Sequence, residues 1–268
     1  MKTLKLVMLA TFHLSVAWGQ TAEEILCKTE DEYRKHVNYI DKGQQVSEIY
    51  GDQTMPGGFA YLLAMDRDGN IYHWINEFSN RKIIGAIYKK EAGELNGSYQ
   101  RLGIAEEPFP CSAYEAGGRL LATGGGILWL AGSLFYPDYL EETPGDASQL
   151  QFYDSVQRLP DTLLGDKTCY VVETTKKFLI TEKMADDSNR RGDSIRETHG
   201  LPPIHQSPPF KKLPGELTLK AKFYIHYGDF LIVQFDESKY DISQLKSSRS
   251  LKMHPLFDVK DFNAYLKE

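Results

Sequence analysis

The residues with the most evident chemical potential lie in one short acidic segment. Asp66, Asp68 and Asn70 alternate along the chain, and Glu77 occupies the twelfth position counted from Asp66. Oxygen ligands at these positions are those of a calcium-binding EF-hand loop. However, the sixth position is Ile71, where the sharp bend of that loop requires glycine, and the following residues alternate as in a β-strand. We therefore interpret this segment as a hairpin turn and predict no metal ion there.

Histidine offers a second route to chemistry, through metal binding or acid–base catalysis. Glu197, His199 and His205 cluster in a polar region, but their spacing matches no known ligand motif. The chain has no Gly-x-Ser-x-Gly nucleophile elbow, no His-Glu-x-x-His pair and no Gly-x-x-x-x-Gly-Lys phosphate loop. We therefore predict no catalytic residue, no metal and no cofactor. An active site dispersed along the chain stays open as an alternative.

Cysteine chemistry also stays open at this point. Cys27, Cys111 and Cys169 are an odd number of thiols. A disulfide between Cys111 and Cys169 would leave one free thiol, and the alternative is three separate thiols. No Cys-x-x-Cys pair supports zinc binding or redox catalysis.

The first twenty residues have the pattern of a secretory signal peptide. Lys2 and Lys5 supply the positive start, and residues 6–18 form an apolar stretch that is too short to span a bilayer. Small residues at Ala17 and Gly19 fit the specificity of a signal peptidase. We therefore expect residues 1–20 to be removed, and the mature protein to work in the periplasm or outside the cell.

The composition is that of an acidic globular protein with much β-structure. The formal net charge of −6 argues against a general electrostatic attraction to nucleic acid. Hydrophobic residues make up 41% of the chain, which is enough for a folded core, and 16 Tyr and 13 Phe favour strands. We expect a soluble monomer that does not bind nucleic acid.

The elements that must position these residues begin with one amphipathic helix. Thr21 and Glu24 form the pattern of a capping box, and apolar residues then recur at helical spacing, which predicts a helix from about residue 22 to 36. After this helix the period of the pattern changes to two. Antiparallel strands are predicted over 39–50, 59–65, 71–75, 83–88, 169–173, 177–181, 217–226 and 229–235.

Two segments between these strands differ in character. The apolar residues 127–136 follow three glycines and predict a short buried helix. Residues 184–216 are polar and contain five prolines, which predicts a long exposed loop within a single domain spanning 21–268.

Several segments in this order resemble the LolA/LolB-like lipoprotein-carrier superfamily, and in particular its uncharacterised secreted branch. They are the helix start at 21–26 with the strand start at 39–43, the stretch 164–174, and the tail from Tyr240 to Phe262. The sequence also departs from that pattern. Members usually carry an Arg-Pro step in the second or third strand, whereas Arg67 here precedes an aspartate inside a turn.

The resemblance implies a mainly β fold of the α+β class, in which helices cover a strongly curved antiparallel sheet, or half-barrel. An apolar inner face under a loosely packed lid would form a cavity suited to acyl chains. The inner-face candidates are Tyr61, Leu63, Trp74, Phe223, Ile225 and Phe235, and the lid candidates are Leu128, Trp129 and Phe135. The alternative is that these side chains only pack a core.

The resulting prediction is an exported, non-enzymatic carrier or binding protein for a lipid, an acyl chain or a lipoprotein. Its partner would be a lipid or an acylated protein, with transient contact to a membrane or a membrane protein. Movement of the lid around residues 124–140 would release the ligand. The alternatives are a secreted enzyme with a dispersed active site, and a structural or interaction module that acts through residues 184–216.

Overall fold

One antiparallel sheet dominates the structure. The computed structural model describes residues 19–50, 54–77, 82–91, 94–101, 104–105, 109–111, 134–135, 153–198, 203, 213–241 and 244–262. The strands in these residues are β1 (Asn38–Ile49), β2 (Met55–Asp66), β3 (Ile71–Glu77), β4 (Lys82–Glu91), β5 (Glu94–Arg101), β6 (Ile104–Ala105), β7 (Phe109–Cys111), β8 (Ser155–Leu164), β9 (Lys167–Ile180), β10 (Gly215–His226), β11 (Ile232–Asp241), β12 (Gln244–Lys252) and β13 (Pro255–Phe257).

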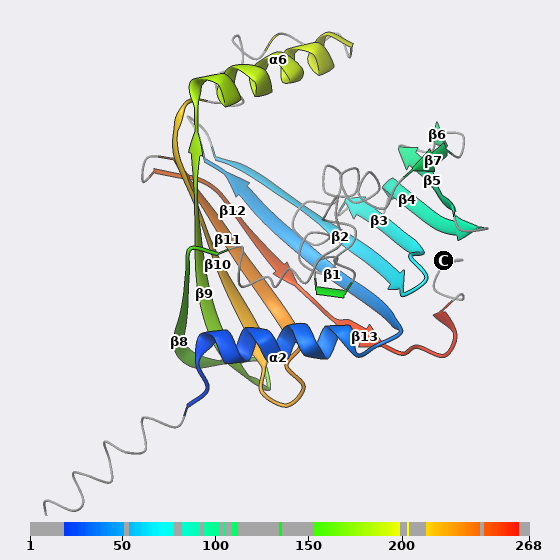
Figure 1. The fold of residues 1–268 in the computed structure, drawn as a ribbon, viewed down its shortest axis with the longest axis vertical. Coiled ribbons are helices and arrows are strands. Elements are labelled where there is room, and N and C mark those ends of the chain that lie inside the picture. Colours follow the sequence, from blue (N-terminus) through cyan, green and yellow to red (C-terminus); the bar gives the residue numbers. More distant parts are fainter. Residues whose placement is uncertain are drawn as a thin grey trace, which may run out of the picture.

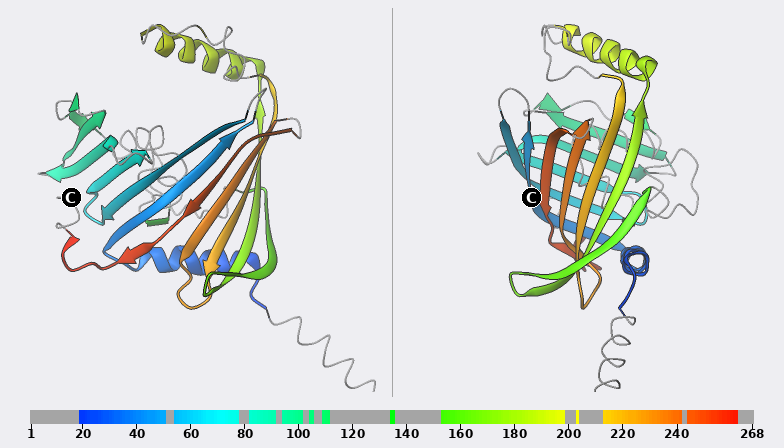
Figure 2. Two further views of the ribbon diagram at one scale, coloured as in Figure 1. Left: turned by 180° about the vertical axis from the view of Figure 1, so that it is seen from behind. Right: turned by 90° about the vertical axis from the view of Figure 1, so that its left-hand side faces the viewer.

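The order of the strands joins two meanders into a single surface. Across the sheet it runs β6-β5-β4-β3-β2-β1-β12-β11-β10-β9-β8, with β7 paired to β5 and β13 paired to β1. Because β1 pairs with β2 on one side and with β12 on the other, it links the first half of the chain to the second. The sheet is curved and does not close (Figures 1 and 2). The predicted half-barrel of antiparallel strands is therefore confirmed.

The predicted N-terminal helix forms as α2 (Ala22–Arg34) and lies across one face of the sheet, near one end of its strands (Figure 1). Its capping box is present: the amide of Glu24 donates to Thr21 Oγ1 over 3.1 Å, and the amide of Thr21 donates to Glu24 Oε2 over 2.9 Å. Ile25, Leu26 and Tyr33 recur on the side that meets the sheet and are buried. We call the face under α2 the inner face and the opposite one the outer face.

The strand predictions from residue 39 to 88 are confirmed by β1 to β4. The acidic segment is the predicted hairpin turn, in which the carboxylate of Asp66 accepts from the amide of Asn70 over 2.9 Å and Gly69 has a φ of 90°. The two strands predicted over 169–181 are one continuous strand, β9, because the threonines and lysines between them keep the same pairing with β10.

The prediction of a long loop over 184–216 is wrong at both ends. Residues up to Thr198 belong to the helix α6 (Glu182–Thr198), and β10 begins at Gly215. The five prolines all lie after residue 201, so they do not interrupt the helix, and Thr181 Oγ1 accepts from the amide of Met184 at its start. Figures 1 and 2 show that α6 projects beyond the end of β9 and does not cover the sheet.

Of the two alternatives left open for the cysteines, the Cys111–Cys169 disulfide does not form. Cys169 is a free, buried thiol on β9, and Cys27 is free and exposed on α2. Cys111 is on β7, which pairs with β5 on the far side of β1, whereas β9 lies on the other side of it. The strand order therefore separates the two cysteines.

Candidate ligand-binding site on the inner face

The register of the strands shows how the inner face is built. In an antiparallel sheet, directly paired residues point to the same side. Val172, Phe223, Phe235 and Leu251 are paired in succession across β9, β10, β11 and β12. All four belong to the apolar cluster that contains Ile25 and other residues of α2. We call these four residues the apolar row.

Most of the predicted site residues meet in this cluster. Tyr61, Leu63, Phe223, Ile225, Phe235 and Phe135 are each no more than 4% exposed and belong to it. The rings of Phe223 and Phe235 are edge-to-face at a centroid distance of 5.1 Å. Together they form one contiguous apolar surface shared by both meanders.

The other three predicted residues are only partly placed or not described. Trp74 is in β3, where its backbone pairs with Leu62, and its side chain lies outside the described part of the structure. Leu62 packs in a smaller cluster with Ile40 and Ala64. Leu128 and Trp129 lie outside the described residues, as does the rest of the predicted helix over 127–136 except residues 134 and 135.

The helix predicted from about residue 22 to 36 covers this surface, a role that the sequence analysis did not assign to it. Ile25, Leu26 and Tyr33 of α2 are each at most 5% exposed and pack against the inner face. Their helical spacing was evident, but only the strand order shows what they contact. Among the described residues, the cover of the inner face consists of α2 and the Leu134–Phe135 pair, which is also buried.

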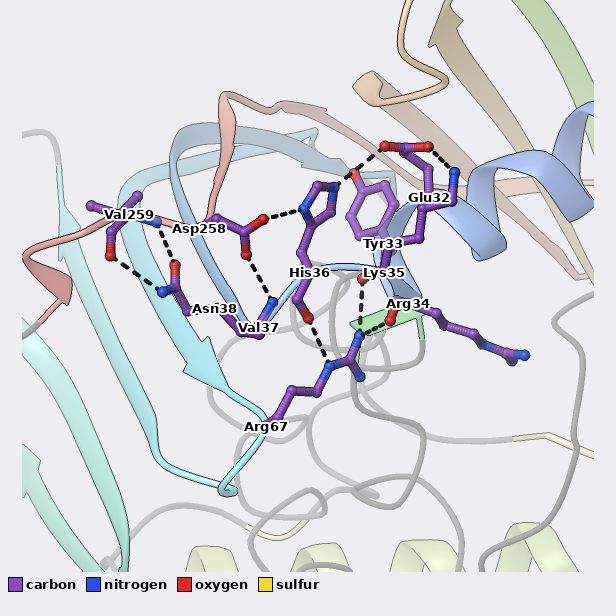
Figure 3. A network of polar contacts seen from close by, with 10 residues as sticks. All are labelled: Glu32, Tyr33, Arg34, Lys35, His36, Val37, Asn38, Arg67, Asp258 and Val259. Carbon is purple, nitrogen blue, oxygen red and sulfur yellow. Dashed lines mark hydrogen bonds and ion pairs between the residues drawn. The ribbon is translucent and has the colours of Figure 1, made fainter.

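Arg67 connects these two parts of the cover. It follows β2 directly, and its guanidinium donates to the carbonyl oxygens of Tyr33 over 3.1 Å, Arg34 over 2.8 Å and His36 over 2.9 Å (Figure 3). It also donates to the carbonyl of Phe135, and its central carbon lies 4.1 Å from the centre of that ring. A cation at the C-terminal end of a helix satisfies its last carbonyls and favours the helix dipole. Arg67 thus joins the end of α2 and Phe135 to the turn that follows β2.

The end of α2 is also held by the C-terminal part of the chain. Asp258 accepts from His36 Nδ1 over 2.8 Å and from the amide of Val37 over 2.8 Å (Figure 3). The hydrogen bond from His36 is the main reason that the pKa of Asp258 is lowered. Asn38 adds a further pair of hydrogen bonds to the backbone of Val259.

One ionisable side chain is buried under the apolar cluster. The Asp41 carboxylate accepts from the hydroxyls of Tyr61 over 2.8 Å and Tyr39 over 3.1 Å, and from the amide of His254 over 2.7 Å. Burial raises its pKa, although these donors oppose the shift. Gly43 makes room for Tyr61, since a Cβ there would lie 2.3 Å from its hydroxyl oxygen. The predicted ligand contact Tyr61 therefore has its hydroxyl engaged in positioning β1 against β2.

His73 is a second buried polar residue on the inner face, where its backbone pairs with Leu63. Desolvation lowers its pKa to about 3, so the ring is neutral at physiological pH. Neither ring nitrogen has a hydrogen-bond partner among the described residues. Sequence patterning gave no reason to separate this histidine from the others.

The outer face over the same central strands is polar. A shallow groove of about 290 Å³ lies at β1, β11 and β12. Its lining includes Val46, Asp236, Ser248 and Ser250 of the outer face, and also Ser47, Glu237 and Arg249, which alternate with them along the same strands. In the part of the chain that the structure describes, no group of three or more histidine, cysteine or acidic side chains is placed to hold a metal ion. No described helix combines the length and apolarity needed to cross a bilayer.

Comparisons with known proteins give matches in structure only. No family model matches the sequence, and no curated protein is similar to it at a significant level. Among solved structures, the chain is similar to a DUF1329 family protein from Desulfovibrio piger, with 8% identity, a TM-score of 0.33 and coverage of 92% of this chain and 97% of that one.

A LolA superfamily protein from Nitrosomonas europaea also matches, with 12% identity, a TM-score of 0.32 and coverage of 91% of this chain and 96% of that one. The lipoprotein LppX from Mycobacterium tuberculosis matches with 9% identity, a TM-score of 0.38 and coverage of 86% and 93%. The superfamily that the sequence resembles is thus among the structural matches. At these TM-scores we draw no ligand or activity from them.

Proposed function

We propose that this protein is an exported, non-enzymatic carrier that buries an acyl chain or a similar amphiphile against the inner face of its sheet. The observation that carries the proposal is the single wide apolar surface formed by both meanders. Phe235 and Leu63 lie on it, in strands separated by β1 and β12. The sheet is curved and α2 lies across this surface. Each methylene of a ligand buried against it would contribute roughly 0.8 kcal/mol.

Release of the ligand requires the cover to move. Phe135 lies within the predicted lid over 124–140 and is tied through Arg67 to the end of α2. Breaking the contacts of this one side chain would free both parts of the cover from the hairpin turn after β2. Export follows from the signal-peptide pattern of residues 1–20.

The arrangement of histidines supports binding more than catalysis. His36 and His226 each contact a carboxylate, Asp258 and Asp229 respectively, at 2.8 and 2.9 Å. Both carboxylates also accept from nearby backbone amides at a helix end and a hairpin turn. These groups therefore have structural roles at the ends of β1 and β10.

The test is binding by the mature chain, residues 21–268, purified from the periplasm of a bacterial host. We expect mass spectrometry of an organic extract to find co-purifying lipid, and a fluorescent fatty-acid analogue to bind and be displaced by lipids. A folded protein that carries no lipid and binds no probe contradicts the proposal.

Two neighbouring valines provide a matched pair of variants. Val172 is on the inner face, whereas Val171 pairs with Tyr224 on the outer face, and both are at most 5% exposed. Val172→Ala removes two carbon atoms from the inner face, and at about 0.8 kcal/mol for each we expect it to weaken the binding of an acyl chain by up to about fifteenfold. Val171→Ala should leave the affinity unchanged. If both variants lose stability and neither changes binding, the inner face is only a packed core.

A further inference from the structure

The inner face changes from apolar to polar between one row of residues and the next. Ser47, Arg249, Glu237 and Thr174 are on β1, β12, β11 and β9, and they are joined by direct pairings that pass through Ala221 of β10. We call them the polar row. Each is two residues along its strand from the apolar row or its continuation, so the two rows are roughly 7 Å apart.

The charges in the polar row cancel. Arg249 Nη2 lies 2.9 Å from Glu237 Oε2, and the two side chains are 23% and 17% exposed. An ion pair that is partly buried is costly unless its remaining donors and acceptors are satisfied. Arg249 Nε is buried and has no hydrogen-bond partner among the described residues.

A buried acceptor lies on the adjacent strand, β1. Gln45 continues the apolar row on β1, where it pairs with Leu251, and it is 7% exposed. Its Oε1 atom also has no partner among the described residues. Gln45 is a diagonal neighbour of Arg249 on the same face, because Ser47 pairs with Arg249, and such neighbours lie within reach of long side chains.

We propose that Gln45 and Arg249 bind the uncharged polar group of an amphiphile whose acyl chain lies on the apolar row. This inference rests on the proposed function and names its ligand class. Arg249 Nε–H donates to a carbonyl oxygen of the ligand, and Gln45 Oε1 accepts from its hydroxyl or amide hydrogen. A free carboxylate is disfavoured, because Glu237 already neutralises Arg249 and would repel a second anion. The ligand is therefore an acyl ester with a free hydroxyl or an N-acyl amide.

Displacement of a fluorescent acyl probe tests this specificity. The competitors are a monoacylglycerol, an N-acylethanolamine and a free fatty acid of equal chain length, at neutral pH. We expect the two uncharged ligands to bind about tenfold more tightly than the fatty acid, the value of one good hydrogen bond. The stronger of the two shows whether the polar group is an ester or an amide.

Variants separate this site from general apolar binding. Gln45→Met removes the acceptor at similar volume, and we expect it to abolish the tenfold preference for the uncharged ligands over the fatty acid. Gln44→Met, at the exposed neighbouring position, is the control and keeps the preference. Arg249→Lys keeps the positive charge but lacks Nε, and it tests the donor independently if Gln45→Met does not fold.

The outcomes distinguish the two proposals. If no acyl probe binds to the folded wild-type protein, the proposed function fails and this inference fails with it. If probes bind but the fatty acid competes as well as the uncharged ligands, or if both variants keep the wild-type preference, the polar-group site is overturned and the apolar carrier remains.

Discussion

The two helices α2 and α6 begin with the same kind of capping residue but lie in very different surroundings. Each begins with a threonine whose hydroxyl accepts a backbone amide, and α6 is the longer of the two. Yet α2 buries six residues against the sheet, whereas Ala185 is the one buried residue among the described side chains of α6. A helix becomes a cover only when its apolar side meets the sheet and its end is held there.

The largest contrast should appear in the packing of the two helices. Ile25→Ala in α2 removes a fully buried side chain, and we expect a loss of about 2–5 kcal/mol in the free energy of unfolding. Met184→Ala in α6, where the side chain is 55% exposed, should change it by less than about 0.5 kcal/mol. Urea denaturation followed by circular dichroism measures both, and equal losses would show that α6 also packs against the sheet.

The next effect concerns the arginine that holds the end of α2. Arg67→Met keeps much of the side-chain volume but removes the donors to Tyr33 and Phe135, and we expect a loss of about 2–3 kcal/mol. Arg190→Met is the matched control in α6, because its ion pair with Asp187 is at the surface and contributes little.

Hydrogen exchange adds the readout for movement of the cover. If amide exchange in Arg67→Met is faster in α2 while β10 and β11 stay protected, the Arg67 side chain keeps α2 packed on the inner face. Uniformly faster exchange across the sheet would instead indicate that Arg67 only contributes to global stability.

A smaller effect is expected at the first residue of each helix. Thr21→Ala should lower the free energy of unfolding by about 1 kcal/mol, because α2 folds together with the sheet. Thr181→Ala should reduce helical content in α6 while leaving the unfolding midpoint of the sheet nearly unchanged. Near-ultraviolet circular dichroism follows the packing of the sheet, and far-ultraviolet circular dichroism follows the helical content. A shifted unfolding midpoint of the sheet in Thr181→Ala would contradict the expected difference between α2 and α6.

The smallest effect is the pH dependence contributed by Asp258. The pKa of this exposed carboxyl is lowered in the folded protein by its hydrogen bond from His36. Its contribution to stability is therefore present above the unfolded-state pKa and is lost as the pH falls through the folded-state value. We expect Asp258→Asn to make stability less dependent on pH between about 5 and 3, measured by urea midpoints at several pH values.

Much of the architecture could be predicted from local pattern. The capping box at Thr21, the alternation from Tyr39 onward and the glycine of the Asp66 turn are short-range signals, and each corresponds to the element expected. The loop prediction over 184–216 failed because it treated the whole segment as one unit. Its prolines all lie after residue 201, and a proline disrupts a helix only around its own position, so residues up to Thr198 can form α6.

The candidate site could be predicted in part. Alternation was enough to select Leu63, Phe223 and Phe235 as residues of one face, because a strand repeats every two residues. Arg67 was visible only as a departure from a family pattern, and its partners lie more than 30 residues before it and 68 residues after it. Cys169 stayed unpaired because the strand order, which no local pattern specifies, separates β7 from β9.

Local sequence pattern therefore determines the kinds of element in this protein, the alternation of its strands and the capped start of α2. The tertiary structure decides which helix covers the sheet and which polar side chains share its inner face. The pairing of Ser47 with Arg249 joins residues about 200 positions apart, and it depends on β1 and β12 meeting at the junction of the two meanders. The reason is physical: such contacts depend on the free energy of the whole fold, and local propensities contribute only part of it.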